Sequence, residues 1–202
     1  MLSQHTNTME AATLPSIENS SIENSSIENS SIENSSINNS SIDLFHHLSN
    51  KWTLWAHLPH NIDWSVKSYI PISTFTTIEE TVAVTESLPH LLVENCMLFL
   101  MLYNVKPMWE DPKNKNGGCF SYKVSNKNVV VAWANLTYAI IGGSISNGNA
   151  FVNSVTGITI SPKKNFCIIK IWMSNCDHQN PSHIIPIKGM SNDGCLFKKH
   201  MA

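Results

Sequence analysis

The sequence has little charge and no excess of positive charge. Charged residues make up 14% of its 202 residues, and 13 Lys+Arg against 15 Asp+Glu give a formal net charge of −2. A protein that holds long nucleic acids through its overall electrostatic field needs a strongly basic surface. The composition therefore excludes that class of binding, and any site for phosphate groups must be local.

The cysteines are few and show no paired spacing. Their number, five, is odd, and none of them forms a Cys-x-x-Cys pair, which argues against both a disulfide framework and a zinc knuckle. Cys176-Asp177-His178 with His183 leaves a metal site open as an alternative, but free thiols are the simpler interpretation. We expect no cofactor and no structural metal.

Long hydrophobic runs are also missing. The apolar stretches Cys96–Val105 and Val129–Ile141 are interrupted and too short to cross a bilayer. The N-terminus shows no basic region followed by an apolar run, so we expect no secretory signal, and the sequon Asn135-Leu136-Thr137 is then a compositional coincidence. These absences predict a cytoplasmic protein without membrane contact.

Residues 1–43 differ in composition from the rest of the chain. The pentapeptide Ser-Ile-Glu-Asn-Ser occurs four times from Ser16 to Ser35 and then decays towards Asp43. A period of five fits neither a helix nor a strand, and one isoleucine per repeat buries too little surface to offset the entropy of the chain. We expect a disordered low-complexity tail; a short β-solenoid is the alternative, but the repeats lack glycines for tight corners.

The sequence of residues 44–202 predicts one domain that contains both strands and helices. The segment Thr76-Thr77-Ile78-Glu79-Glu80 is typical of a helix start, and Val129–Ile141 is expected to begin as a strand and continue as a helix up to Gly142-Gly143. Antiparallel strands with separate helices indicate an α+β domain with its helices on one face of the sheet. The expected strands are Leu48–Leu58, Pro71–Phe75, Cys96–Tyr103, Cys119–Val124 as the returning strand after a turn, Phe151–Ile160 and Phe166–Trp172.

The segment Pro107-Met108-Trp109-Glu110-Asp111 is the most informative part of the chain. Pro107 favours an extended or loop conformation around it, which places an indole next to a carboxylate outside any helix. An exposed indole face attracts cations and stacks on nucleobases, while an ionised glutamate accepts two parallel N–H donors. This pair could therefore recognise a methylated guanine. The alternative is that Trp109 belongs to the core and Glu110 is a solvated neighbour.

Three segments in order resemble the eukaryotic translation initiation factor 4E family of messenger-RNA cap-binding proteins. They are Lys106–Gly118, with the signature around Trp109-Glu110, the opening segment His46–Trp55, and the hairpin Gly157–Trp172. The resemblance covers about Phe45 to Cys176. It implies a curved antiparallel sheet with about three helices on its convex face and a cap-binding slot on its concave face.

The resemblance also implies roles for individual residues. Two tryptophans that sandwich 7-methylguanine match Trp64 and Trp109, the carboxylate that accepts the N1–H and N2–H of the base matches Glu110, and Trp172 matches the indole near the added methyl group. The positive charge of the methylated base adds an electrostatic term to stacking. For Trp64 a structural role is the alternative, because Asp63-Trp64-Ser65 is a less distinctive sequence.

The resemblance is weaker at the basic positions that the family uses for the phosphates of the cap. Lys163 matches a basic family position, a second basic position falls on Ile168, and a third is replaced by Cys119. Lys170 lies two residues after Ile168, hence on the same strand face, and is expected to reach the phosphates instead. The alternative for Lys163 and its neighbour Lys164 is that they only solubilise a turn.

The convex surface departs further from the family. A helix tryptophan that anchors the tyrosine-and-leucine motif of scaffold factors and inhibitors corresponds to Val82. We expect scaffold binding to be weak or rewired towards a dedicated partner, because an indole at an interface centre typically contributes about 2 kcal/mol or more. Other positions, such as Ala134, are altered as well. The residues expected on this partner surface are His46, Leu48, Ile78, Val82, Asn135 and Tyr138.

The expected function is binding of the 7-methylguanosine 5′ cap of messenger RNA in translation initiation, without enzymatic activity. One alternative is a cap-sequestering repressor or a selector of special transcripts, which the altered convex surface favours. A decapping hydrolase that uses Glu110 and Asp111 as metal ligands is the remaining alternative. It lacks the clustered glutamates and the Gly-rich turn and helix that such enzymes show.

Overall fold

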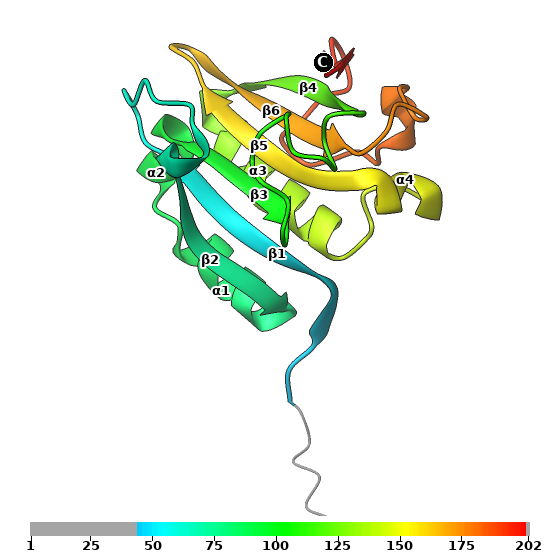
Figure 1. Cartoon of the computed structure of the whole chain (residues 1–202), viewed down its shortest axis with the longest axis horizontal. Coiled ribbons are helices and arrows are strands. Elements are labelled where there is room, and N and C mark those ends of the chain that lie inside the picture. Colours follow the sequence, from blue (N-terminus) through cyan, green and yellow to red (C-terminus); the bar gives the residue numbers. More distant parts are fainter. Residues whose placement is uncertain (1–43, 201–202) are drawn as a thin grey trace, which may run out of the picture. The chain divides into compact units, whose positions relative to one another are not determined.

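The computed structural model describes residues 44–200, which form one antiparallel sheet with helices against one face (Figure 1). The expected tail, residues 1–43, lies outside the described residues. The seven strands are arranged in the order β2-β1-β3-β5-β6-β4-β7. Their bounds are β1 His47–His57, β2 Tyr69–Thr77, β3 Met97–Leu102, β4 Gly118–Ser125, β5 Val155–Pro162, β6 Phe166–Met173 and β7 Leu196–Lys199.

The larger apolar core lies between the sheet and its helices. Alternate residues of β1, namely Trp52, Leu54 and Ala56, are buried on this face, as period-two alternation requires. The opposite face carries a smaller buried cluster, whose members are Tyr69, Phe99, Met101, Val105 and Trp172. Both faces of the central strands are therefore covered, and the second cluster forms the floor of the concave face.

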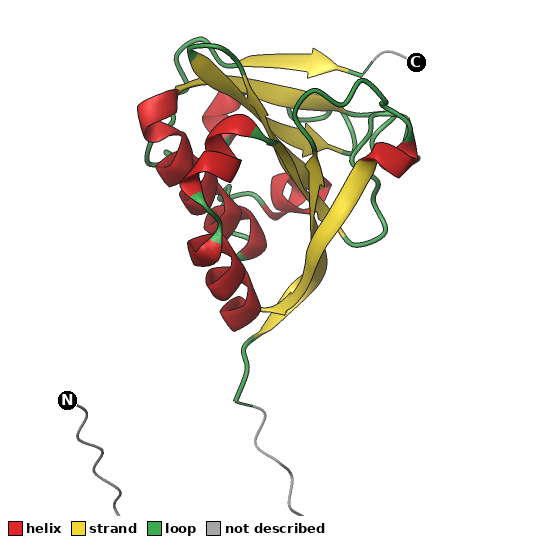
Figure 2. Ribbon diagram, turned by 90° about the vertical axis from the view of Figure 1, so that its left-hand side faces the viewer, coloured by secondary structure: helices red, strands yellow, loops and turns green. Residues whose placement is uncertain are grey.

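Three helices pack on the convex face, as expected, and Figure 2 shows them to one side of the sheet. They are α1 Ile78–Ser87, α2 His90–Asn95 and α3 Asn126–Ile141, while a fourth short helix, α4 Asn149–Ser154, leads directly into β5. The expected start of α1 is confirmed as a capping box: the Thr77 hydroxyl accepts from the Glu80 amide, and the Glu80 carboxylate accepts from the Thr77 amide.

Two segment predictions were wrong. Val129–Ile141 does not begin as a strand, because Val129, Trp133, Leu136 and Ile140 form one buried helical face from its first residue, and this burial outweighs the strand preference of the valines. Phe151–Ile160 begins as helix α4, with the Phe151 ring packed near Phe120, and becomes a strand only at Val155.

The strand that contains Cys119–Val124 does not return along its predecessor. Strand β4 pairs with β6 and β7, whereas β3 pairs with β1 and β5. The connecting segment 103–117 therefore crosses the sheet, and Figure 1 shows it passing in front of β5 and β6. This crossing brings Trp109 and Glu110 over the concave face.

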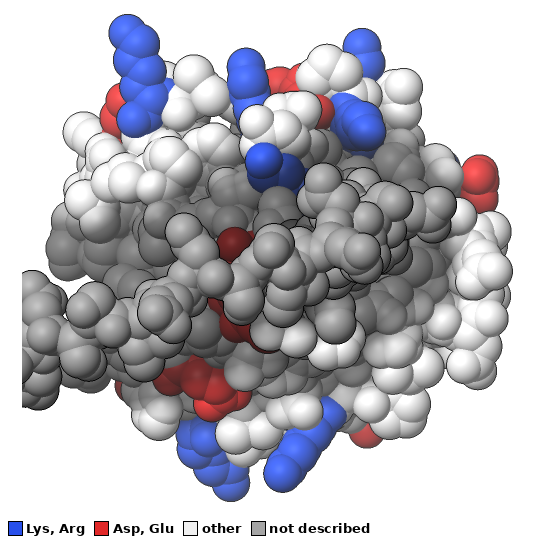
Figure 3. All heavy atoms as spheres, turned by 90° about the horizontal axis from the view of Figure 1, so that it is seen from below, with Lys and Arg blue, Asp and Glu red and all other residues white. Residues whose placement is uncertain are grey.

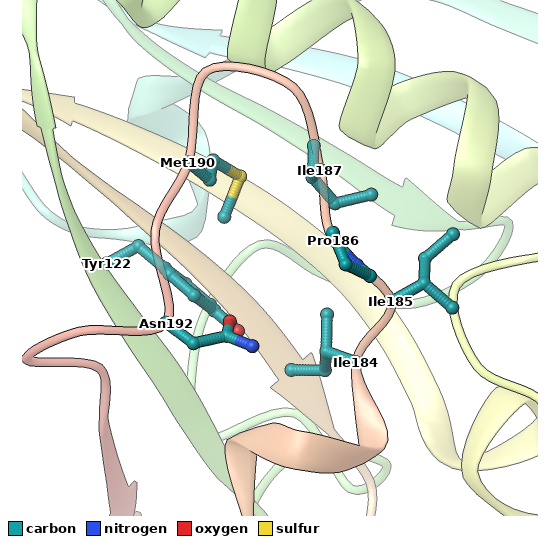
Figure 4. Close-up of a pocket in the computed structure, with 7 residues that line it drawn as sticks. All are labelled: Tyr122, Ile184, Ile185, Pro186, Ile187, Met190 and Asn192. Carbon is teal, nitrogen blue, oxygen red and sulfur yellow. The ribbon is translucent and has the colours of Figure 1, made fainter.

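A small cavity of about 70 Å³ lies beneath the C-terminal segment, which includes the 3-10 helix η2 Pro181–His183 (Figure 4). The Tyr122 ring points into it from β4, and burial raises the pKa of this phenol. Tyr122 is on the opposite face of β4 from Cys119, so this cavity is separate from the concave face. Among the described residues, no helix is long and apolar enough to span a bilayer.

Candidate functional site

Two buried polar side chains hold the crossing segment in shape. The Asp111 carboxylate accepts hydrogen bonds from the amides of Lys106 (2.9 Å) and Lys113 (2.9 Å). The Asn114 amide donates to the carbonyls of Lys106 (3.3 Å) and Met108 (2.9 Å) and accepts from the Thr156 hydroxyl (2.7 Å). This network leaves Trp109 and Glu110 exposed between fixed ends, so the interpretation of Trp109 as a core residue was wrong.

Trp172 lies on the floor of the concave face, on β6. Its indole N–H donates a 2.7 Å hydrogen bond to the Thr159 hydroxyl, and only 7% of its surface is exposed. Its backbone partner on the neighbouring strand β5 is Gly157, where a β-carbon would stand 2.4 Å from the Met101 sulfur and 2.6 Å from the Leu100 carbonyl oxygen. A side chain at this position would force β3 and β5 apart, so glycine keeps the floor around Trp172 compact.

A cleft of about 350 Å³ opens above Trp172. Register explains its lining: Trp172 pairs with Cys119, which pairs with Lys198, and Lys170 lies two residues from Trp172 on the same face. Strand β7 thus adds cations beside the indole floor. The cleft is lined by Trp109, Cys119, Lys170, Trp172, Lys198, Lys199 and His200.

His200 connects the cleft to the crossing segment. Its Nδ1–H donates to the Asn114 carbonyl (2.8 Å), and its ring lies 5.0 Å from Trp172. All 13 basic residues of the chain are lysines, so phosphate groups would meet point charges rather than planar guanidinium forks. In Figure 3, the visible lysines stand at separate points above and below the grey atoms, with acidic side chains among them.

Trp64 is presented by the segment between β1 and β2. One face of its indole stacks on the His57 ring, with centroids 4.1 Å apart and planes within 4°. The indole remains 54% exposed, so its other face is available to a ligand. Trp64 is not among the residues that line the cleft above Trp172.

Glu110 and Trp64 are both linked to Tyr69. Burial raises the pKa of Tyr69, and the negative charge of Glu110 raises it further, which places the carboxylate near this phenol. The Tyr69 ring in turn meets the edge of His57, with centroids 5.4 Å apart. Tyr69 is thus affected by the charge of Glu110 and contacts the ring on which Trp64 stacks.

The remaining sequence-based candidates lie elsewhere. Lys163 is exposed at the tip of the β5–β6 hairpin, where its amide donates to the Phe166 carbonyl, and it does not line the cleft. Asp111 is committed to backbone hydrogen bonds, which removes it from the carboxylate pair that a hydrolase would need. The His178 and His183 rings lie 5.2 Å apart, but in residues 44–200 no group of three or more His, Cys, Asp or Glu could hold a metal ion.

The convex face has an apolar groove of about 430 Å³ between α1 and α3. Ile78, Val82 and Tyr138 line it, and the Tyr138 hydroxyl donates a 2.5 Å hydrogen bond to Glu86. Burial, together with this bond, raises the pKa of Tyr138 to about 12. These three residues of the expected partner surface are thus brought together.

The other three expected partner residues make internal contacts. The His46 ring contacts Glu79 at 2.6 Å, Leu48 packs against the main core, and the Asn135 amide donates to the Val131 carbonyl of its own helix. None of the three lines the groove. Three of the six residues expected on the partner surface therefore do not contribute to the groove.

Sequence reasoning missed His57 and the cations of β7. The residues Leu196-Phe197-Lys198-Lys199 are too few to establish an alternating pattern, although Phe197, which packs against Phe120, and Lys198 do point to opposite faces. The alternation along β1 could have pointed to His57, because it places this residue at the end of the strand on the same face as Thr53 and Trp55.

The family model described as eukaryotic initiation factor 4E matches residues 47–193. The chain belongs to the eukaryotic initiation factor 4E family. It is similar to eukaryotic translation initiation factor 4E of Eremothecium gossypii, with 33% identity over 137 residues that cover 64% of this chain and 63% of that protein. Its similarity to eukaryotic translation initiation factor 4E-2 of Schizosaccharomyces pombe is 31% over 143 residues, covering 67% of this chain and 56% of that protein. The chain thus spans less than two thirds of the length of these two relatives.

Solved structures of the initiation factor 4E family share the fold. A schistosome eIF4E complexed with m7GpppG and 4E-BP matches with a TM-score of 0.60 and 23% identity, covering 67% of this chain and 76% of that one. Caenorhabditis elegans eIF4E-3, in complex with the 4E-binding protein Mextli and a cap analog, matches with a TM-score of 0.58 and 22% identity, covering 65% and 75% of the two chains. At these identities the likeness establishes the α+β architecture.

Proposed function

We propose that this protein binds the 7-methylguanosine 5′ cap of messenger RNA and acts in translation initiation in the cytoplasm. The observation that carries the proposal is the cleft that joins Trp109 and Trp172 to the lysines Lys170 and Lys198, with Glu110 next to Trp109. Flat aromatic faces, a carboxylate and amines are the groups that a methylated guanine with a phosphate chain requires. Membership of the initiation factor 4E family supports the same function.

Each part of the ligand has a proposed partner among these residues. The delocalised positive charge of 7-methylguanine gains an electrostatic attraction to indole faces beyond stacking, of about 0.5–2 kcal/mol per face. An ionised Glu110 accepts the N1–H and N2–H donors of guanine, which adenine cannot supply. Trp64 and Trp109 are the proposed stacking plates, and Trp172 is the indole next to the methyl group.

The phosphate chain is assigned to the cations of the cleft rather than to the hairpin. Lys170 and Lys198 project from the floor strands, and Lys199 and His200 extend the same lining. Lys163 is exposed at the hairpin tip and does not line the cleft. We therefore place Lys170 and Lys198 first as phosphate partners and keep Lys163 as an outer contact.

Tryptophan fluorescence titration with 7-methyl-GTP and with GTP tests the function. The protein should bind the methylated nucleotide and discriminate against GTP; Trp109→Ala should abolish most of the quenching. Glu110→Gln should weaken binding by about 2 kcal/mol or more because the guanine edge loses its charged acceptor. Glu94→Gln, on the convex helix α2, serves as the matched control. Equal affinity for both nucleotides, or an unaffected Glu110→Gln variant, would refute cap recognition.

The groove between α1 and α3 is the proposed docking surface for a scaffold initiation factor or a dedicated partner. Val82 stands where the family has tryptophan, and the Tyr138–Glu86 hydrogen bond occupies part of the groove wall. We therefore propose weak binding of the usual tyrosine-and-leucine motif. A peptide with that motif should bind Val82→Trp about 2 kcal/mol more tightly than the natural chain, with 7-methyl-GTP affinity unchanged.

Translation of a capped reporter separates initiation from sequestration. Addition of the protein to an extract depleted of its own cap-binding factor should restore translation if the chain acts in initiation. If the added protein binds the cap but lowers translation of the reporter further, it acts instead as a cap-sequestering repressor.

A further inference from the structure

The two faces of the Trp64 indole have different surroundings. His57 covers one face in a nearly parallel stack at 4.1 Å, and His57 itself is only 2% exposed. The indole is 54% exposed, so its opposite face remains open. Any base that stacks on Trp64 therefore has the His57 imidazole on the far side of the same ring.

Three further contacts hold His57 in place, two through its ring and one through its backbone carbonyl. Its Nε2–H donates to the Asp63 carbonyl (2.8 Å), its edge meets the Tyr69 ring, and its own carbonyl accepts from the Cys96 thiol (3.2 Å). The hydrogen bond to Asp63 reaches the residue directly before Trp64, so the stack and the hydrogen bond hold one short piece of chain. A side chain held in this way can support its neighbour as a rigid backing.

We infer that His57 is a positioning residue for ligand recognition: it holds the Trp64 plate, and its charge sets how strongly the open face attracts a cationic base. The inference rests on the proposed cap-binding function. With a neutral His57, the outer face of Trp64 offers its full attraction to 7-methylguanine. A protonated His57 would place a second positive charge on the order of 8 Å from the base, on the other side of one indole.

Asp63, Tyr69 and Cys96 are the titratable groups in direct contact with His57 or beside it. The Asp63 carboxylate accepts from the amide (2.8 Å) and hydroxyl (3.0 Å) of Ser65. These bonds keep the pKa of Asp63 below its usual range, and attraction to His57 contributes, so the carboxylate stays ionised near the imidazole. Tyr69 stays neutral because burial raises its pKa, with the charge of Glu110 as a second cause, and burial also raises the pKa of Cys96.

Two variants separate the contacts of His57. His57→Phe keeps a flat ring against Trp64 and cannot carry charge, while His57→Gln keeps an N–H donor for the Asp63 carbonyl and loses the stack. Affinities for 7-methyl-GTP and GTP are measured at pH 7.5 and pH 5.5, since histidine changes charge in this range. The ratio of the affinity for 7-methyl-GTP to that for GTP reports the attraction to the positive charge of the methylated base. The protonation of the ligands themselves changes with pH in the same way for every variant.

Between pH 7.5 and pH 5.5 the preference for 7-methyl-GTP over GTP should change about three- to tenfold less favourably in the natural protein than in His57→Phe, whose pH dependence reports the ligands' own titration. His57→Gln should bind 7-methyl-GTP less tightly at both pH values. The same pH dependence in His57→Phe as in the natural protein, or natural affinity in His57→Gln, would overturn the inference. Absence of any 7-methyl-GTP binding by the natural protein would refute the cap-binding proposal itself.

A measurement on the natural protein covers the case in which a variant does not fold. Nuclear magnetic resonance of the His57 ring follows its protonation with and without saturating 7-methyl-GTP. Because coupling between two binding events is reciprocal, the bound cationic base should shift protonation of His57 to lower pH. An unchanged titration curve on saturation would contradict the coupling.

Discussion

The indole nitrogen of Trp172 and the hydroxyl of Thr159 are joined by a 2.7 Å hydrogen bond across strands β5 and β6. Both residues are buried, so the bond satisfies a donor that water does not reach. It also fixes the orientation of the indole that forms the floor of the cleft.

Thr159→Val keeps the shape of this contact and removes the acceptor. We expect the free energy of unfolding, measured in urea, to fall by about 1–3 kcal/mol, because the indole N–H is left buried and unpaired. Thr159→Ser, which retains the hydroxyl, is the control and should lose less. A Thr159→Val protein as stable as the natural one would mean that the N–H finds another acceptor.

Lys198 and Lys163 should differ in their effect on binding. Lys198→Ala should weaken 7-methyl-GTP binding by about 1 kcal/mol, roughly fivefold, and reduce its dependence on salt, because Lys198 lines the cleft. Lys163→Ala should change affinity much less. Isothermal titration calorimetry with 7-methyl-GTP and with the 7-methylguanosine nucleoside separates phosphate from base contacts. Equal effects on nucleotide and nucleoside would show that Lys198 acts on the base or on the fold.

Asp111 should influence recognition without touching the ligand. Its carboxylate accepts two backbone amides that shape the segment around Trp109, so Asp111→Ala should weaken 7-methyl-GTP binding at least tenfold while Glu110 and both indoles remain. Limited proteolysis should show faster cleavage between residues 103 and 117. Natural affinity in Asp111→Ala would mean that the other contacts of the segment, such as those of Asn114, are sufficient.

The Tyr138–Glu86 contact predicts a loss of stability at high pH. Burial and the carboxylate raise the pKa of Tyr138 from the ordinary tyrosine value of about 10 to about 12. A raised folded-state pKa means that the contribution is fully present below about pH 10 and is lost as pH rises towards 12. Ultraviolet titration of the phenols should show one group ionising near pH 12 that moves lower in Glu86→Gln. No change in that variant would exclude Glu86 as a cause.

Most strands and the start of α1 could be predicted from local patterns. The capping box at Thr77 and Glu80 and the alternation in β1 are complete within short segments, so no tertiary information is needed. The valines at the start of α3 and the residues of α4 were misassigned because burial of Val129 and Phe151 decides their conformation. Strand order was not predictable, since the partner of β4 depends on where the crossing segment runs.

The site was predictable where its chemistry is continuous in sequence. Trp109 and Glu110 are adjacent, and their pairing is visible without a structure. Lys198 reaches the cleft only through its register with Cys119 on β4, and His57 matters only because Trp64 folds back onto it. Such relationships involve separate segments, and only the tertiary structure brings them together.

Strand β7 is four residues long and pairs, among the described strands, with β4 alone. Short edge strands of a sheet open more readily than its central strands. Because Lys198 and Lys199 belong to this strand, an anion held by them would also fasten the strand to its neighbour. Ligand uptake should therefore slow amide hydrogen exchange along Leu196–Lys199, so that occupancy and local order rise together.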